Sequence, residues 1–192
     1  MLVNLLNTFS TAELICLAVL VFSLLVQLYF YLRFYTAIFR NKRRIKKGKI
    51  KLLETLPEVS VIICARNEEE NLKKHLPSVL EQDYPKYEVI VVNDASTDDT
   101  QYVLKGLSVL YPHLKVVNIV ENVNKFQGKK FPISIGIKSA KYEHLVLTKA
   151  NCKPNSFDWL KHIASNFTAN KEIVLGYASV ANKKGLLNKL IQ

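Results

Sequence analysis

Residues 14–32 read LICLAVLVFSLLVQLYFYL, a run of 19 residues in which Ser23 and Gln27 are the clearly polar exceptions. A helix of about 20 predominantly apolar residues crosses the apolar core of a bilayer, so this run is long enough to span one. A cleaved signal peptide would carry its positive charge before a shorter apolar core. Here the positive charge follows the apolar run. The sequence therefore predicts a permanent anchor, with a short N-terminus at 1–12 and a transmembrane helix at 13–36.

The basic residues of the chain are concentrated next to this run. The formal net charge is +11, and residues 33–51 hold nine Lys or Arg and no acidic side chain, which leaves about +2 for the rest. The charge therefore does not indicate a nucleic-acid partner. The positive-inside rule places the basic juxtamembrane linker, 37–56, in the cytoplasm and the N-terminus outside. We expect a single-pass protein of the cell (inner) membrane whose remaining residues lie in the cytoplasm.

After the linker, apolar β-branched segments alternate with amphipathic ones. Residues 59–64, VSVIIC, are typical of a strand buried on both faces. Residues 68–82 carry apolar side chains at helical spacing, and Pro77 is expected to kink or divide this helix. Such alternation predicts an α/β fold with a mostly parallel sheet flanked by helices. The predicted strands are 59–64, 88–92, 114–120, 144–148 and 172–178, and the predicted helices are 68–82, 100–107, 131–140 and 156–167.

Ligands of parallel sheets bind at the carboxyl ends of the strands. Neither of the glycine loops GxGxxG and GxxxxGK[ST] is present there. Polar groups at two neighbouring strand ends can read a base and a ribose without such a loop, and lysines at a helix start can face phosphate. Helix capping and simple solvation are the structural alternatives. The candidate binding residues are Arg66, Glu68, Asp94, Ser96, Lys129 and Lys130.

Four segments follow one another along the chain: VSVIICARNEEENL, VIVVNDASTDDT, GKKFPISIGIKSA and LVLTKANCKP. In order and spacing they resemble the family 2 glycosyltransferases of the GT-A (Rossmann-like) fold, over residues 57–192. The resemblance implies inverting transfer of a sugar from a UDP- or GDP-sugar to a lipid-linked or polysaccharide acceptor. The positions that it assigns to the nucleotide are Asp94 for the base or ribose, Arg66 and Glu68 for the pocket wall, and Lys129 or Lys130.

The segment LTKANCKP departs from the pattern of that family. The family places an Asp-x-Asp motif after the fourth strand, whose carboxylates bind the Mg²⁺ or Mn²⁺ that neutralises the donor diphosphate. Lys149 and Asn151 stand at those positions, so the sequence does not support a conventional metal site. Three interpretations stay open: a catalytically silent homologue, an altered form of an active enzyme, or a metal-independent enzyme in which the Lys149 ammonium supplies positive charge to the diphosphate.

An inverting transferase also needs a general base for the acceptor hydroxyl. The resemblance implies that this carboxylate and the acceptor-binding half lie beyond Gln192, so 57–192 is expected to be an incomplete GT-A domain. Asp158 is the nearest carboxylate, but its place at a predicted helix start favours a capping or solvent-facing role. We expect a membrane-anchored glycosyltransferase domain. The alternative is a catalytically silent, membrane-tethered nucleotide-binding homologue or scaffold.

Overall fold

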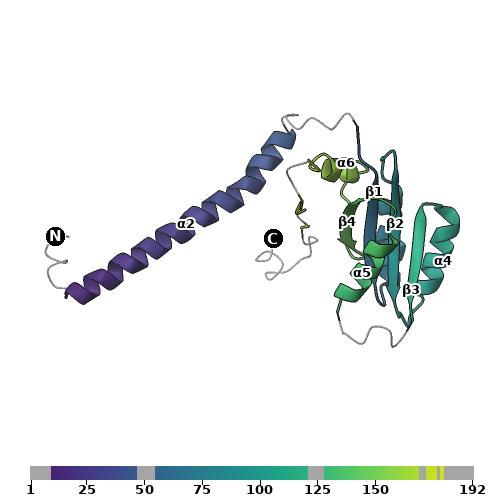
Figure 1. Ribbon diagram of the computed structural model, residues 1–192, viewed down its shortest axis with the longest axis horizontal. Coiled ribbons are helices and arrows are strands. Elements are labelled where there is room, and N and C mark those ends of the chain that lie inside the picture. Colours follow the sequence, from purple (N-terminus) through teal and green to yellow (C-terminus); the bar gives the residue numbers. More distant parts are fainter. Residues whose placement is uncertain (1–9, 47–54, 121–127, 169–171, 177, 180–192) are drawn as a thin grey trace. The chain divides into compact units, whose positions relative to one another are not determined.

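The computed structural model describes residues 10–46, 55–120, 128–168, 172–176 and 178–179. The chain divides into two compact units, residues 1–51 and residues 52–192, and the second of these is the sheet domain. In the described part of the first unit, the chain forms the helix α2 (Thr11–Lys46) (Figure 1). This helix begins with a reciprocal capping box, in which the Ser10 N–H donates to Glu13 Oε2 at 2.7 Å and the Glu13 N–H donates to Ser10 Oγ at 3.4 Å.

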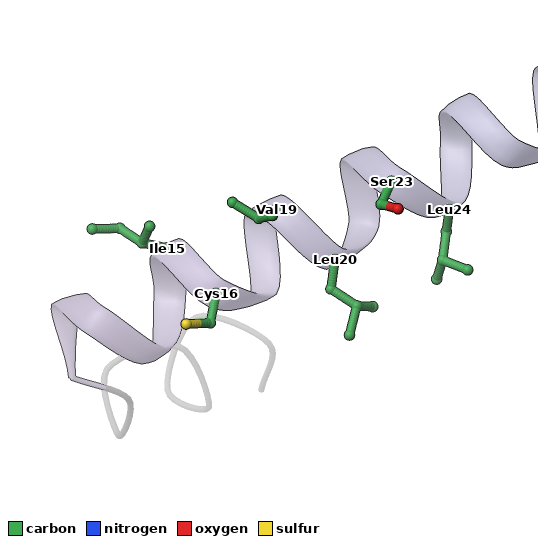
Figure 2. Close-up of a pocket in the computed structure, with 6 residues that line it drawn as sticks. All are labelled: Ile15, Cys16, Val19, Leu20, Ser23 and Leu24. Carbon is green, nitrogen blue, oxygen red and sulfur yellow. The ribbon is translucent and has the colours of Figure 1, made fainter.

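The apolar part of α2 matches the thickness of a membrane. Its segment Thr11–Phe34 is long and apolar enough to cross one, with a length of about 36 Å at 1.5 Å per residue. Figure 2 shows the side chains along a shallow hollow on this helix. The hydroxyl of Ser23 and the thiol of Cys16 are the polar groups among them. The hollow therefore suits apolar chains rather than a polar ligand. Its lining residues are Ile15, Cys16, Val19, Leu20, Ser23 and Leu24.

The sheet domain is built on a four-stranded parallel sheet with the order β3-β2-β1-β4 (Figure 1). This confirms the predicted α/β fold and the first four predicted strands. The strands are β1 (Val59–Ala65), β2 (Tyr87–Asp94), β3 (Leu114–Ile119) and β4 (His144–Lys149). The helices are α3 (Glu69–Leu80), α4 (Thr100–Leu110), α5 (Lys130–Ser139) and α6 (Trp159–Ala164).

Helices cover both faces of the sheet, because successive side chains of a strand point to opposite faces. On one face, Val61 and Ile63 of β1 join a core cluster with buried side chains of α3, α4 and α6. On the other face, Ile90 and Val92 of β2 form a second cluster with apolar side chains of α5. The central strand β1 is thus buried on both sides, as its continuous apolar run predicts.

The structure differs from two expectations. Of the kink or division expected at Pro77, the division is wrong: Pro77 lies inside α3, and the Glu81 N–H donates to the Pro77 carbonyl at 2.9 Å. The predicted strand at 172–178 is absent from the described residues of that segment. Ile173 and Leu175 are 78% and 91% exposed there, so the apolar pattern has no sheet to pair with and no core to enter.

Candidate functional site

The carboxyl ends of the four strands bring the candidate residues to one edge of the sheet. In the parallel register, Cys64 of β1 stands beside both Val92 of β2 and Lys149 of β4, and Ala65 stands beside Asn93. The loops that follow β1 and β2 therefore leave the sheet side by side, next to the end of β4. A ligand at this edge would meet side chains from three strands and from the start of α5.

Hydrogen bonds clasp the loop after β1 to the loop after β2. The Asn67 N–H donates to Ser96 Oγ at 3.0 Å, and Asn67 Oδ1 accepts from the Thr97 N–H at 2.8 Å and from its hydroxyl at 3.3 Å. Asn67 has φ of 54°, a left-handed conformation that Asn tolerates better than other residues with a Cβ. Ala95, in the second loop, has φ of 47° and is also in the left-handed region. These two loops are the Asn67–Thr97 clasp.

A second set of bonds continues the clasp into the helices. The Glu68 N–H donates to Thr100 Oγ1 at 3.1 Å, and Asp98 accepts from the Glu69 N–H at 3.3 Å and from the Thr100 N–H at 3.1 Å. Partial burial would by itself raise the pKa of the Asp98 carboxyl, but hydrogen bonds from Thr100 and from these backbone groups together lower it. Backbone donors at the start of α3 are thus satisfied by the neighbouring loop rather than left open to a ligand.

A polar pocket of about 300 Å³ opens beside the clasp, between the ends of β2 and β3. Asn93 Nδ2 donates to Asn118 Oδ1 at 3.0 Å across the two strands, and Asn93 Oδ1 accepts from the Ser96 N–H at 3.3 Å. Amides and hydroxyls offer both hydrogen-bond donors and hydrogen-bond acceptors, and these can pair with the polar edge of a nucleotide base. The lining residues are Asn93, Ala95, Ser96, Thr97, Gln101, Asn118, Ile119 and Val120.

The structure places the acidic and hydroxyl candidates on the same edge, in different environments. Ser96 lines the pocket and accepts in the clasp. Asp94 is the last residue of β2 and is 8% exposed. Glu68 is half-buried, and its Oε2 accepts from Asn71 Nδ2 at 2.6 Å, so this carboxylate is held toward its own helix.

The basic candidates surround the end of β1. Arg66 is exposed directly after that strand, and Lys129 and Lys130 are exposed at the start of α5. Burial raises the pKa of the Cys64 thiol, the positive charge of Lys129 lowers it, and the negative charge of Asp94 raises it further. Both charges therefore act on the thiol at the end of β1.

The end of β4 does not offer a divalent metal the ligands it needs. Lys149 is the last residue of the strand, and its carbonyl accepts from the Cys152 N–H at 3.0 Å in the turn that follows. Asn151 is exposed in that turn, with Oδ1 3.8 Å from the Cys152 thiol. The part of the chain that the structure describes contains no group of three or more His, Cys, Asp or Glu that could hold a metal. An ammonium and one neutral amide are poor partners for Mg²⁺ or Mn²⁺.

Sequence reasoning missed the side chains that hold the loops together. Asn67, Thr97 and Thr100 act on partners about 30 residues away in the chain, which no local pattern reports. Of the capping or solvent-facing role expected for Asp158, the structure shows the second: Asp158 makes no cap hydrogen bond at the start of α6, and its side chain is 54% exposed. Its carboxylate lies 3.2 Å from Lys161 Nζ instead.

Replacing Asn67 with Ala is expected to lower the free energy of unfolding of the sheet domain by about 2 kcal/mol. The change removes the hydrogen bonds to Thr97 and forces a less tolerant residue into the left-handed conformation. Asn67→Gly is the matched control, because glycine adopts that conformation freely and should cost only about 1 kcal/mol. Denaturant unfolding measures both variants. If the alanine variant and the wild type have the same free energy of unfolding, the clasp does not stabilise the domain.

Comparisons with known proteins agree on one family. A family model described as "Glycosyl transferase family 2" matches residues 60–190. Glycosyltransferase AglE of Haloferax volcanii is 33% identical over 127 residues, which are 65% of this chain and 40% of AglE. Poly-beta-1,6-N-acetyl-D-glucosamine synthase of Staphylococcus epidermidis is 28% identical over 134 residues, which are 69% of this chain and 31% of the synthase. The chain thus spans less than half the length of these curated relatives.

A solved structure has a similar fold. The mannosyltransferase PcManGT from Pyrobaculum calidifontis, in complex with GDP-Man and Mn²⁺, matches with a TM-score of 0.50 and 26% identity. The match covers 72% of this chain and 42% of PcManGT.

Proposed function

Because the chain belongs to glycosyl transferase family 2, we propose that its sheet domain binds a nucleotide-sugar donor and transfers the sugar, with inversion, to a lipid-linked or polysaccharide acceptor. The observation that carries the proposal is the Asn67–Thr97 clasp, which holds two strand-end loops beside a pocket of amides and hydroxyls. Rigid loops at the carboxyl edge of a parallel sheet are where such folds place their ligands.

The pocket suits the nucleoside half of the donor. Asn93, Asn118 and Gln101 supply amide groups for the base, and the carboxylate of Asp94 is an acceptor for ribose hydroxyls. Arg66 and Glu68 form the pocket wall on the side of β1 in this proposal. The bound GDP-Man of PcManGT supports a nucleoside diphosphate sugar as the class of donor.

In this proposal, basic side chains bind the diphosphate half of the donor. Lys129 and Lys130 stand at the start of α5, where a cation and the positive end of the helix dipole act together on phosphate. In the transfer step, the acceptor hydroxyl attacks the anomeric carbon, the bond from that carbon to the diphosphate oxygen breaks, and the hydroxyl proton passes to a base. The single displacement inverts the anomeric carbon, and the nucleoside diphosphate leaves.

The acceptor and the location of the reaction form part of the same proposal. The name of the Staphylococcus epidermidis relative specifies a polysaccharide product, which supports a growing glycan as acceptor. The segment Thr11–Phe34 would anchor the chain in the cell membrane, and the exposed Arg43 lies on the same helix beyond it. By the positive-inside rule, this basic side faces the cytoplasm and so does the sheet domain.

A second candidate rests on the end of β4. Because Lys149 and Asn151 stand where the resemblance to the family implies carboxylates, the domain could have kept the nucleotide site and lost the chemistry. Incubation of the full chain with UDP- and GDP-sugars and a glycan acceptor distinguishes the two functions. Release of nucleoside diphosphate with sugar in the acceptor supports the transferase. Binding of nucleotide without release from any donor supports the silent homologue.

Replacing Asp94 with Asn is expected to weaken the binding of UDP or GDP about tenfold, through loss of a charge-assisted hydrogen bond to the ribose. Calorimetric titration of the full chain in detergent measures the affinity, and the rise in melting temperature with ligand measures it independently. Asp99→Asn is the matched control, since it removes the same charge from an exposed position of the same loop. Unchanged affinity in the Asp94 variant would refute the pocket assignment.

A further inference from the structure

Positive charge gathers at the carboxyl edge of the sheet from three separate elements. Arg66 follows β1, Lys149 ends β4 and stands beside Cys64 in the register, and Lys129 precedes α5. All three side chains are exposed. Since β4 is the neighbour of β1 in the sheet, the ammonium of Lys149 enters this edge from the side opposite β2.

Three of the carboxylates near this edge are hydrogen-bonded or buried. Asp98 accepts from the N–H groups of Glu69 and Thr100. Glu68 accepts from the side-chain amide of Asn71. Asp94 is buried at the end of β2. The exposed side chains directly after β1 and at the end of β4 are basic, whereas the exposed carboxylates of Glu70 and Asp99 belong to the starts of α3 and α4.

This arrangement disagrees with a metal-dependent donor site. The structural neighbour PcManGT was solved in complex with GDP-Man and Mn²⁺, whereas Lys149 and Asn151 at the end of β4 here would repel a divalent cation or bind it weakly. A nucleoside diphosphate nevertheless needs a positive partner, both to bind and to leave with its charge stabilised.

We propose that Lys149 is a diphosphate-binding residue, whose ammonium makes nucleotide binding by this chain independent of divalent metal. The inference rests on the proposed function and deepens it by specifying how the diphosphate is held. A lysine ammonium is a compact point charge with three donors on a long stem, so it can reach a phosphate oxygen that no carboxylate-bound ion bridges. Lys129 and Arg66 add charge from the other elements of the edge.

Titration of UDP and GDP into the full chain in detergent tests the proposal, first with EDTA and then with MnCl₂. We expect the better nucleotide to bind with the same affinity, within about twofold, in both buffers. Binding that appears only with MnCl₂ would overturn the role of Lys149 and leave the proposed function standing. Absence of binding to either nucleotide in both buffers would overturn the proposed function itself.

Variants give a second, independent readout in EDTA. Lys149→Ala should weaken nucleotide binding about tenfold, and Lys149→Arg should restore most of it because the positive charge returns. Lys138→Ala is the matched control: Lys138 is an exposed lysine in the last turn of α5, at the opposite edge of the sheet. Equal affinities for Lys149→Ala and the wild type would overturn the proposal. The melting temperature without ligand verifies that each variant is folded.

A paramagnetic measurement separates charge replacement from a hidden metal site. The electron paramagnetic resonance signal of Mn²⁺ should show no ion bound to the wild-type chain beyond that bound by the nucleotide alone. The double variant Lys149→Asp with Asn151→Asp should bind Mn²⁺ in the presence of nucleotide, because two carboxylates then end β4. Stoichiometric Mn²⁺ on the wild-type chain with nucleotide would contradict the inference.

Discussion

Replacing Gly136 with Val is expected to lower the free energy of unfolding of the sheet domain by about 3 kcal/mol. Gly136 lies in α5 where the helix backbone meets the sheet, and a Cβ built there would be 2.6 Å from Ile62 Cγ2 and 3.2 Å from Val92 Cγ2. Ile62 is 1% exposed and Val92 is fully buried, so neither side chain has room to move aside. The added side chain must push α5 away from β1 and β2.

Gly106 offers the matched control in α4. A Cβ at Gly106 would have no heavy atom within 4 Å, and the position is in a helix interior. Gly106→Ala should therefore stabilise the domain by about 0.5–1 kcal/mol, through helix propensity alone. Denaturant unfolding followed by fluorescence reports both changes, because the single tryptophan, Trp159, packs against the core of the sheet domain. Wild-type stability of the Gly136 variant would show that α5 does not approach the sheet at this position.

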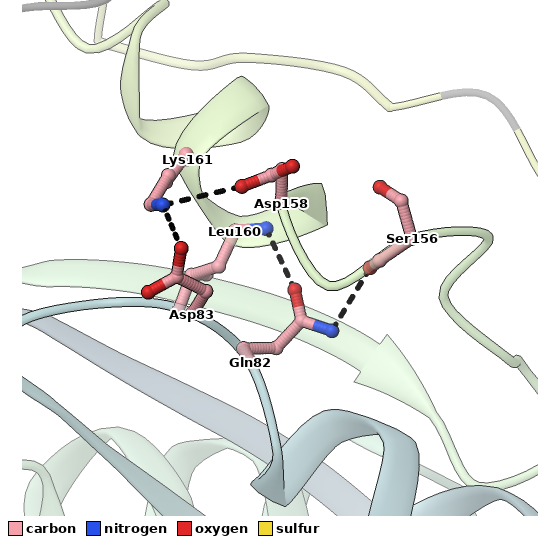
Figure 3. Close-up of polar contacts among 6 residues, drawn as sticks. All are labelled: Gln82, Asp83, Ser156, Asp158, Leu160 and Lys161. Atoms are coloured by element: carbon pink, nitrogen blue, oxygen red, sulfur yellow. Dashed lines mark hydrogen bonds and ion pairs between the residues drawn. The ribbon is translucent and has the colours of Figure 1, made fainter.

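Replacing Gln82 with Leu is expected to cost about 3 kcal/mol, because it leaves buried backbone groups without partners. Gln82 is 7% exposed at the junction between α3 and α6 (Figure 3). Its Oε1 accepts from the Leu160 N–H at 3.1 Å, and its Nε2 donates to the carbonyls of Ser156 at 3.1 Å and Ser78 at 2.8 Å. Leucine fills a similar volume and replaces none of these bonds.

Lys161 provides the comparison at the same junction. Figure 3 shows its ammonium paired with the carboxylates of Asp83 and Asp158. Because these carboxylates are exposed, Lys161→Met should cost no more than about 1 kcal/mol. Hydrogen exchange of the Leu160 amide, with denaturant unfolding, separates the two variants. A Gln82→Leu variant as stable as Lys161→Met would contradict the buried role of this amide.

The Gln82 junction also bears on the site. The segment from Lys149 to α6 carries the turn with Asn151, and Gln82 fixes its far end at Ser156 and Leu160. Loosening this end lengthens the free segment after β4, so the position of Lys149 becomes less restricted. If Gln82→Leu also changes the affinity for nucleotide, the change would show that the position of the segment after β4 matters for binding at the carboxyl edge of the sheet.

Several features followed from the sequence alone. The apolar run VSVIIC could only be a strand buried on both faces, since each of its side chains must leave water whichever face it points to. The alternation of such strands with amphipathic helices specifies a parallel sheet, because parallel neighbours need a crossover. The placing of Arg66, Asp94 and Ser96 at strand ends followed from the same pattern. A resemblance in four short segments led to the family that the family model confirms.

Prediction from local sequence patterns failed where the structure depends on contacts between residues far apart in the chain. Residues 172–178 have the composition of a strand, yet their described part does not pair, because a strand exists only with a neighbour to satisfy its backbone. Asn67 and Thr97 are ordinary loop residues until the sheet register brings β1 and β2 together. In the sequence, Gly136 is an ordinary glycine of a predicted helix. Its importance follows from Ile62, which lies against it in the folded domain.

The sequence by itself thus determined the kind of fold, the apolar helix and the edge of the sheet at which polar residues collect. These depend on periodicity and composition, which are properties of neighbouring residues. The tertiary structure alone decided which loops are tied to each other, which carboxylates are engaged, and that Lys149 enters the edge beside β1. These depend on strand order and register, which join residues 28 to 85 positions apart and leave no trace in any local pattern.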